Sequence, residues 1–321
     1  MHSFIRVLAL GFIIAGSNAT SAAEYPNRPI KWIVPYAAGG GADTLARLIE
    51  PEMTKRLGQP IFIENKPGAA SAIAAVEVAR SAPDGYTIFS ADNGTLIYNP
   101  ALYKKLPYNL KQFLPVSMLA RSPSILVAGP SIEVHSVQEL FDKIKRQPGK
   151  FSYASSGPGS PHAMAMELLK VQVGLEMIHV PYRGGALSIQ DVAAGQIPMA
   201  MTDFSSGSGL INAGRLRALA VANAKRMPQL PDVPTFDELG FNGIYAEAFG
   251  GIVVSAGTPP EIVTKLQLAI QGALEEPRVK ARLFDLGQEP VGGDAKQFAA
   301  VLDTETARWH KLIRDLNISL D

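Results

Sequence analysis

The sequence has no cysteine, and it has no apolar run long enough to predict a membrane span. Without cysteine there are no disulfides, thiolate metal sites, cysteine nucleophiles or lipid anchors on an N-terminal cysteine. A bilayer-spanning helix needs about 20 apolar residues, and charges or prolines interrupt every apolar run before that length. The chain has to fold on its hydrophobic core, and 321 residues that are 47% apolar can supply one.

A charge excess of either sign is also missing. The 30 Lys and Arg residues face 29 Asp and Glu residues, and one of the 30, Arg6, lies within the first 23 residues. The rest of the chain is therefore balanced, at 29 against 29. A protein without a basic field does not attract nucleic acid or anionic lipid, so we expect neither as a partner.

The first 23 residues have the pattern of a secretory leader. The basic residue Arg6 precedes an apolar run at 7–15, and small residues at 21–23 come just before Glu24. This arrangement is typical of a cleaved signal peptide rather than of a membrane anchor. We expect residues 1–23 to be removed and the mature protein to work in the periplasm, without a lipid anchor.

Strand and helix patterns alternate along the rest of the chain. A short β-branched segment, a glycine loop and an amphipathic segment form the first unit, and this order recurs. The patterns predict strands at 30–35, 61–64, 86–90, 151–154, 177–180, 197–201, 216–222 and 251–254, and helices at 43–57, 69–80, 161–173, 186–194, 260–274, 277–286 and 296–317. Repeated βα units predict an α/β fold of mainly parallel sheets flanked by helices.

The length predicts two lobes, since a domain usually holds about 100 to 200 residues. Extended apolar segments meet turn residues near Pro123 and Gly250, and there we expect the chain to cross between the lobes. Lobe 1 is then 24–122 plus 250–321, and lobe 2 is 123–249. Ligands of open α/β sheets bind beyond the carboxyl ends of the strands, so the loops after the strands are the candidate site.

The loop after the first predicted strand contains Gly39-Gly40-Gly41, followed by Asp43. The glycines permit close approach of a ligand, and the helix behind them presents free N–H groups to an anion. A Walker loop would need Lys before Ser or Thr, and a dinucleotide loop would need glycine in place of Thr44, so nucleotide binding is not expected. The loop is either an anion cradle or a tight turn in which Asp43 caps the helix.

Three more loops at strand ends are polar or rich in glycine. They are residues 90–95, 154–162 and 181–185. In the second of these, Ser160 has the features of a helix cap, but helix capping does not explain Ser155 or the neighbouring glycines. Four such loops exceed what turns require, so we expect them to surround one ligand.

Short motifs along essentially the whole mature chain occur in the order known from one family. They are Tyr25-Pro26-Asn27-Arg28-Pro29-Ile30, Gly39-Gly40, Asp43, Ala46-Arg47, Glu64-Asn65-Lys66-Pro67-Gly68-Ala69, Pro83-Asp84-Gly85-Tyr86-Thr87, Asn99-Pro100, Tyr153-Ala154-Ser155-Ser156-Gly157, Pro181-Tyr182-Arg183-Gly184-Gly185, Gly195-Gln196 and Leu219-Ala220-Val221. In these motifs the chain resembles the periplasmic substrate-binding proteins of tripartite tricarboxylate transporters, the Bug family.

The resemblance implies a two-lobed periplasmic-binding-protein fold of the type II-like, Venus flytrap kind. It implies capture of a small di-, tri- or aromatic carboxylate by backbone N–H groups, hydroxyls and water, and delivery to the small and large membrane subunits of a permease. We expect a monomer without a cofactor. Carried onto this sequence, the resemblance and the loop at 90–95 give these ligand-binding candidates: Tyr36, Ala38, Gly39, Asp43, Asn93, Ser155, Ser160, His162, Tyr182, Gly184 and Asp203.

Several details of the ligand stay open at this stage. The chain departs from the family pattern at 203–208 and 254–259, two loops that could tune the pocket. Arg183 either contacts a second carboxylate in bidentate fashion or is a solvated turn residue. Six aromatic residues either stack on an aromatic acid or form the pocket wall: Tyr36, Tyr98, Tyr182, Phe204, Tyr245 and Phe249.

Two other functions are possible from the sequence. Ser160, His162 and Asp203 have the side chains of a hydrolytic triad, but the serine lacks the G-x-S-x-G elbow and Pro161 removes the following N–H group, so we expect no enzyme. The five histidines lack metal-binding spacing, so no metal is expected. A clamshell protein of this kind can also sense its ligand for a signalling receptor, and no residue separates sensing from import.

Overall fold

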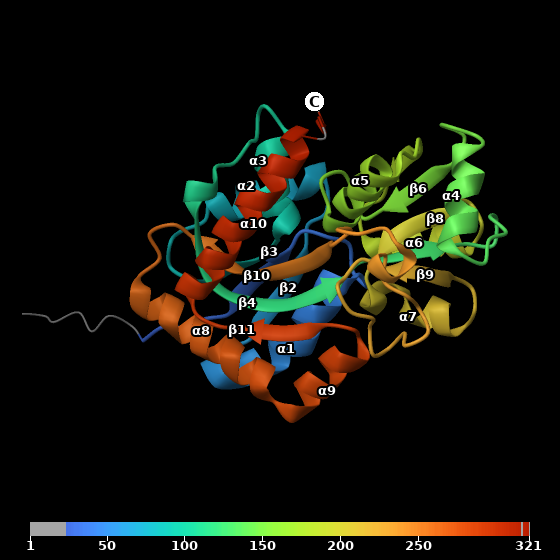
Figure 1. The fold of residues 1–321 in the computed structure, drawn as a ribbon. Helices are drawn as coiled ribbons and strands as arrows, with labels where there is room; N and C mark the ends of the chain where they lie inside the picture. Colours follow the sequence, from blue (N-terminus) through green and yellow to red (C-terminus); the bar gives the residue numbers. More distant parts are fainter. Residues whose placement is uncertain (1–23, 316, 321) are drawn as a thin grey trace, which may run out of the picture.

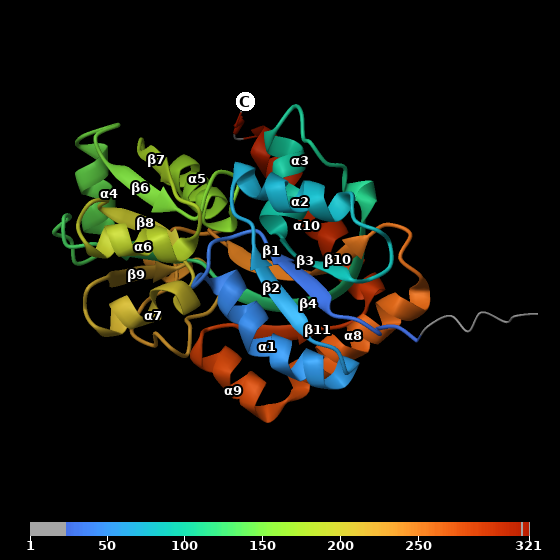
Figure 2. The same ribbon diagram turned by 180° about the vertical axis from the view of Figure 1, so that it is seen from behind.

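The computed structural model describes residues 24–315 and 317–320, and the predicted leader at 1–23 lies outside the described residues. Two α/β lobes lie side by side, each built around one sheet (Figures 1 and 2). In the described ranges, no helix has both the length and the apolar character needed to cross a membrane.

The first lobe contains a six-stranded sheet in the order β11-β4-β10-β3-β1-β2. Its strands are β1 (Ile30–Val34), β2 (Ile61–Asn65), β3 (Thr87–Asp92), β4 (Phe113–Pro123), β10 (Glu247–Ser255) and β11 (Glu289–Gly292). Its helices are α1 (Gly41–Leu57), α2 (Ala72–Ala79), α3 (Asn99–Leu102), α8 (Pro260–Glu275), α9 (Pro277–Asp285) and α10 (Ala295–Asp315). Helices α1, α8 and α9 cover one face of the sheet, and α2, α3 and α10 cover the other (Figure 2).

The second lobe contains a five-stranded sheet in the order β7-β6-β8-β5-β9. Its strands are β5 (Ile125–Ala128), β6 (Ser152–Ser155), β7 (Ile178–Pro181), β8 (Met199–Thr202) and β9 (Arg217–Val221). Its helices are α4 (Val137–Lys145), α5 (Pro161–Val173), α6 (Gly185–Ala193) and α7 (Phe204–Asn212). Separate hydrophobic clusters fill the two faces of this sheet as well, so both lobes have three layers.

Strand β1 shows why the sheets are covered on both sides. Ile30, Trp32 and Val34 enter the cluster formed with α1 and α8, whereas Ile33 enters the cluster on the opposite face. Successive side chains of a strand point to opposite faces, so a strand that is apolar at consecutive positions needs helices on both. The predicted two-lobed α/β fold is confirmed.

The expectation of mainly parallel sheets is wrong for part of each lobe. Strands β1, β2 and β3 are parallel, as are β6, β7 and β8, but β4, β10 and β11 pair antiparallel, and β5 pairs antiparallel with β8 and β9. The chain passes directly from β4 into β5 and later returns through β10. These strands connect the lobes without a crossover helix, which is the connection that parallel pairing requires.

The sequence patterns miss strands β4, β5 and β11 and helices α3, α4 and α7. Strand β4 contains two prolines, and its pairing with β10 is interrupted by register shifts, so it shows no regular alternation. Residues 203–208, expected as a loop, instead cap and begin α7, because the Asp203 side chain accepts a hydrogen bond from Ser206 N at 2.7 Å. The cap starts a helix in a segment whose serine and glycine content does not favour one.

The predicted helix at 69–80 begins only at Ala72, because a left-handed turn precedes it. Gly68 has φ 123°, and Ala69, Ala70 and Ser71 follow with φ values of 47°, 50° and 70°. A left-handed conformation costs about 1–2 kcal/mol for a residue with a side chain. The turn is held in place by Asn99 Nδ2, which donates to the Ala70 carbonyl at 2.7 Å.

Replacing Ala70 by glycine relieves this strain, and we expect Ala70→Gly to raise the free energy of unfolding by about 1 kcal/mol. The control is Ala300→Gly in the right-handed helix α10, which we expect to lower it by about 0.5–1 kcal/mol. Urea unfolding of residues 24–321 measures both. Equal losses of stability in the two variants would mean that the turn is not left-handed in solution.

Candidate functional site

The carboxyl ends of the parallel strands of both sheets meet at the junction of the lobes. Four helices begin there: α1 after β1, α5 after β6, α6 after β7 and α7 after β8. Each helix start has N–H groups without intrahelical partners and carries the positive end of the helix dipole. The two lobes therefore direct hydrogen-bond donors into one cleft.

The cleft contains two hollows that share Tyr36 and Ser156. The inner hollow encloses about 770 Å³, including the part open to solvent, and is lined mainly by Tyr36, Gly41, Leu45, Asp92, Leu119, Arg121, Ser156, His162, Asp203, Phe249 and Gln288. The outer hollow encloses about 880 Å³ and is lined mainly by Tyr36, Ala70, Ser71, Ser156, Gly157, Ser160, Tyr182 and Arg183.

Tyr36 lies between the hollows and is fixed by Asp92. Its hydroxyl donates to Asp92 Oδ2 at 2.5 Å, while Thr95 N and Thr95 Oγ1 donate to Asp92 Oδ1 at 2.8 Å each. Burial and the neighbouring Asp92 charge both raise the pKa of Tyr36 well above its ordinary value. Tyr36 is therefore a neutral donor that points at a carboxylate of the protein.

Asp43 braces the first loop from behind. Its carboxylate accepts hydrogen bonds from Gly39 N at 2.9 Å, Asn65 Nδ2 at 2.9 Å and Arg47 Nε at 3.0 Å, and only 2% of the residue is exposed. Burial opposes ionisation of Asp43, but these donors lower its pKa overall. Asp43 is not the helix cap, because Gly40 is the N-cap of α1, and its carboxylate lies outside the lining of both hollows.

Other predicted residues also lie behind the cleft. Ala38 and Gly39 are exposed and line neither hollow, whereas the next two glycines line the inner one. Asn93 is fully buried and donates to Tyr98 Oη at 2.6 Å and to the Glu247 carbonyl at 2.8 Å. Of the loop at 90–95, Ser90, Ala91 and Asp92 line the inner hollow.

The β6–α5 loop contributes Ser156 rather than Ser155 to the inner hollow. Ser155, the last residue of β6, is fully buried, and its Oγ lies 2.7 Å from His179 Nε2. Side chains alternate along a strand, so Ser156 points the other way, into the cleft. Ser160 caps α5 by accepting from Ala163 N at 3.3 Å and also lines the outer hollow.

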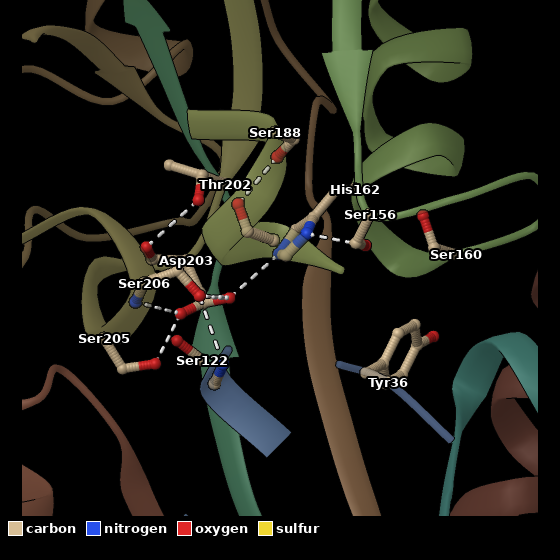
Figure 3. Close-up of polar contacts among 12 residues, drawn as sticks. Tyr36, Ser122, Ser156, Ser160, His162, Ser188, Thr202, Asp203, Ser205 and Ser206 are labelled. Carbon is tan, nitrogen blue, oxygen red and sulfur yellow. Dashed lines mark hydrogen bonds and ion pairs between the residues drawn. The ribbon is translucent and has the colours of Figure 1, made fainter. Parts of the chain in front are cut away.

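His162 connects the loops of the second lobe. Figure 3 shows Ser156 on one side of its ring, with Oγ 3.0 Å from Nδ1, and Asp203 on the other, with Oδ2 3.2 Å from Nε2. The second contact has the distance of an ion pair but lacks hydrogen-bond geometry. Burial opposes ionisation of Asp203, but His162 and the Ser205 and Ser206 donors outweigh it and lower the pKa of Asp203 to about 2.

The β7–α6 loop contacts the first lobe directly. Ala37 N donates to the Arg183 carbonyl at 3.0 Å, and a Cβ on the buried Gly184 would lie 3.4 Å from the Ala37 Cβ. Tyr182 donates to Asp191 Oδ2 at 2.6 Å, and both Tyr182 and the exposed Arg183 side chain line the outer hollow.

The first turns of α1 and α7 form a second direct contact between the lobes. Gly41 N donates to Ser206 Oγ at 3.1 Å, and Gln288 Nε2 lies 3.5 Å from the Gly41 carbonyl and 3.4 Å from Ser205 Oγ. A Cβ on Gly41 would lie 2.8 Å from Ser205 Oγ and about as close to the Asp203 carboxylate. The two lobes therefore touch here, and a side chain at position 41 would force Ser205 or Asp203 to shift.

The sequence reasoning missed Gly41, Asp92, Ser156 and Gln288. The first three belong to loops that the sequence analysis identified, but in each loop it predicted a nearby residue as the ligand contact instead. Gln288 carries no local signal, because it reaches the cleft from the distant α9–β11 connection. Of the aromatic candidates, Tyr36 and Phe249 line the inner hollow and Tyr36 and Tyr182 line the outer one.

The cleft does not include the departure at 254–259. Strand β10 lines the inner hollow with residues 248–251, while Val254 and Ser255 pair with the opposite end of β4. Among residues 24–315 and 317–320, no group of three or more His, Cys, Asp or Glu side chains is placed to hold a metal ion.

The low pKa of Asp203 predicts a pH-dependent contribution to stability. The shift from 3.8 to about 2 corresponds to roughly 2 kcal/mol, fully present above the unfolded pKa and lost as the pH falls through the folded one. We expect Asp203→Asn to be less stable than wild type by about this amount at pH 7 and by about half of it at pH 3. Urea unfolding at several pH values measures this difference.

The control for that measurement is Asp303→Asn, the same change on the exposed surface of α10, which we expect to have no such effect. If the loss in Asp203→Asn were the same at pH 7 and pH 3, the charge of the carboxylate would not be its cause.

Comparison with known proteins identifies the family. Residues 45–318 match the family model described as tripartite tricarboxylate transporter family receptor. The UPF0065 protein of the tcbD-tcbE intergenic region of Pseudomonas sp. strain P51 is 34% identical over 320 residues, covering 98% of this chain and 95% of that protein. BugT of Bordetella pertussis is 31% identical over 323 residues, covering 100% of this chain and 99% of BugT.

Solved structures agree with these matches. The periplasmic binding protein BugD has a TM-score of 0.88 at 30% identity, covering 92% of this chain and 99% of BugD. Rpa4515 of R. palustris, with adipate, has a TM-score of 0.89 at 33% identity, covering 92% of this chain and 99% of Rpa4515. MatC (Rpa3494) of Rhodopseudomonas palustris, with bound malate, has a TM-score of 0.87 at 33% identity, covering 90% of this chain and 100% of MatC.

The resemblance read from the sequence motifs is thus confirmed at the level of sequence and of fold. The chain belongs to the tripartite tricarboxylate transporter receptor family and has the fold of its Bug-type periplasmic binding proteins.

Proposed function

We propose that this protein is a periplasmic receptor that captures a small carboxylate between its lobes and delivers it to a membrane permease of the tripartite tricarboxylate type. The observation that carries the proposal is the convergence of four helix N-termini, from both lobes, on one cleft. The adipate and malate bound to the related Rpa4515 and MatC support a carboxylate as the ligand.

Neutral donors are sufficient for this capture. A hydrogen bond to a charged group contributes roughly 1.5–3 kcal/mol, so six of them contribute roughly 9–18 kcal/mol. Association costs about 4–15 kcal/mol, and a micromolar dissociation constant needs a net gain of about 8 kcal/mol. Backbone amides and hydroxyls therefore give useful affinity without a basic surface.

Within this proposal the ligand contacts are the residues that line the two hollows. They include Tyr36, Ser160, His162, Tyr182 and Asp203 from the sequence-based set, joined by Ser156 and Arg183. Among the other candidates, Asp43 and Ser155 hold their loops in shape, and Gly184 permits the contact with the first lobe.

Transport follows from movement of the lobes about the connections near Pro123 and Gly250. We assign 24–122 with 250–321 to lobe 1 and 123–249 to lobe 2, since β10 pairs with β3 only from Gly250 onward. A ligand that contacts both lobes stabilises the closed form by the difference between its closed-state and open-state affinities. The permease then recognises the closed form of an exported, unanchored monomer whose leader has been removed.

The cleft favours binding over catalysis. His162 contacts Ser156 and Asp203, as a hydrolytic triad would require, but Ser160 is the helix cap and not the partner of the histidine. In a nucleophile elbow the N–H after the serine stabilises the oxyanion. Here that group, Gly157 N, donates to Ser155 Oγ at 3.1 Å, so the hydrolase alternative has no oxyanion donor at this position.

The alternative output is sensing, in which the closed form contacts a signalling receptor. Deletion of the gene separates the two outputs. Loss of carboxylate uptake is the result expected for the receptor of a permease. Intact uptake with lost induction of a carboxylate-responsive gene would replace import by sensing.

A thermal-shift screen of residues 24–321 tests the ligand class. A ligand at 100 times its dissociation constant adds about 2.7 kcal/mol to the stability of the folded state. We expect shifts in the melting temperature with carboxylates and none with sugars or nucleotides, after refolding to remove copurified ligand. Shifts with sugars or nucleotides alone would contradict the proposal.

Closure around the ligand is tested by Gly41→Ala. The added methyl group collides with Ser205 and Asp203 only in the closed form, so we expect at least about tenfold weaker binding at an unchanged melting temperature without ligand. The control is Gly209→Ala on α7, where a Cβ meets nothing within 4 Å and wild-type affinity is expected. Wild-type affinity in Gly41→Ala would rule out closure at this contact.

A further inference from the structure

The charges that line the inner hollow are mainly negative. Asp92 receives its three hydrogen bonds from Tyr36 and Thr95, which are neutral donors, so its negative charge is not offset by an ion pair among those contacts. Asp203 also lines this hollow and is ionised at neutral pH, with His162 beside it. A second carboxylate placed here would face like charges.

The one arginine on the inner hollow does not reverse this sign. Arg121 Nη1 lies 3.9 Å from Glu247 Oε2, and the Arg121 side chain is 37% exposed. Glu247 thus balances its charge, and solvent screens it. The starts of α1, α5, α6 and α7 also reach this hollow, but Gly41 N at the start of α1 already donates to Ser206 Oγ. The rest of the wall is largely apolar and includes Leu45, Leu119 and Phe249.

The outer hollow has the opposite character. Its lining includes the Arg183 side chain, the Ser160 hydroxyl and the glycine loop before α5, and it includes no Asp or Glu among the described residues. A ligand that reaches both hollows past Tyr36 and Ser156 therefore meets donors and a cation at one end, and an apolar wall with carboxylates at the other.

We infer that the ligand carries a single carboxylate, bound at the outer hollow, and an uncharged apolar body in the inner hollow, and that Asp92 determines this specificity by rejecting a second carboxylate. The inference rests on the proposed function and names the substrate class of that site. It separates this chain from the relatives that hold the dicarboxylates adipate and malate. Two like charges about 5 Å apart repel enough, at an effective dielectric constant of about 20, to change affinity more than tenfold.

Calorimetry on residues 24–321, refolded without ligand, tests the inference with two matched pairs of probes. Benzoate and terephthalate differ by one carboxylate at the far end of the ring. The pair 3-phenylpropionate and phenylalanine differs by one ammonium group. We expect benzoate to bind at least about tenfold more tightly than terephthalate, and 3-phenylpropionate more tightly than phenylalanine.

The decisive variant is Asp92→Asn, which keeps the size of the side chain and an oxygen for the Thr95 donors. We expect it to raise the ratio of terephthalate affinity to benzoate affinity at least about tenfold, because only terephthalate brings a second carboxylate toward position 92. The matched control, Asp303→Asn on the exposed face of α10, leaves both affinities unchanged. If Asp92→Asn does not fold, Asp92→Ser removes the same charge and keeps a hydrogen-bonding oxygen.

The failures of this inference and of the proposed function are distinct. Equal affinity of the wild type for benzoate and terephthalate, an equal effect of Asp92→Asn on both, or tighter binding of phenylalanine than of 3-phenylpropionate would each overturn the inference and leave a carboxylate receptor in place. No binding of any carboxylate in the screen described above would overturn the proposed function, and the inference with it.

Discussion

The contact between the first turns of α1 and α7 determines the geometry of the whole cleft. Asp203 caps α7, and this places its carboxylate beside His162 on one side and beside Gly41 on the other. A side chain at position 41 would collide with Ser205 and Asp203, and a displaced Asp203 would release both His162 and the serine donors of α7. The contact between the lobes and the positions of His162 and the start of α7 within the second lobe therefore depend on the same carboxylate.

The cleft combines two electrostatic environments that are usually found in different pockets. Arg183 and the start of α5 at Ser160 make the outer hollow favourable for an anion, although the chain as a whole has almost no net charge. Asp92 and Asp203 make the inner hollow unfavourable for one. Because Tyr36 donates to Asp92 and lines both hollows, it marks the boundary between them. A ligand with different ends thus has a preferred orientation.

The supporting shell around the cleft explains why several motif residues do not touch it. Asp43, Ser155 and Asn93 are buried and hydrogen-bonded to neighbouring loops and strands. The left-handed turn at 68–71 shows the same principle, since its strained backbone lines the outer hollow and is held by Asn99. In this protein the residues that shape a loop and the residues that face the ligand are often sequence neighbours.

The sequence by itself determined the α/β class, the two lobes, most strand and helix positions and the loops that form the cleft, because these follow from local periodicity and from glycine and serine placement. The family resemblance followed from the order of its motifs. Only the tertiary structure decided which residue of each loop faces the cleft, as between Ser155 and Ser156, because a shift of one position reverses the direction of a side chain. It also decided the antiparallel connecting strands and the role of Gln288, since pairing and approach between distant segments leave no local pattern.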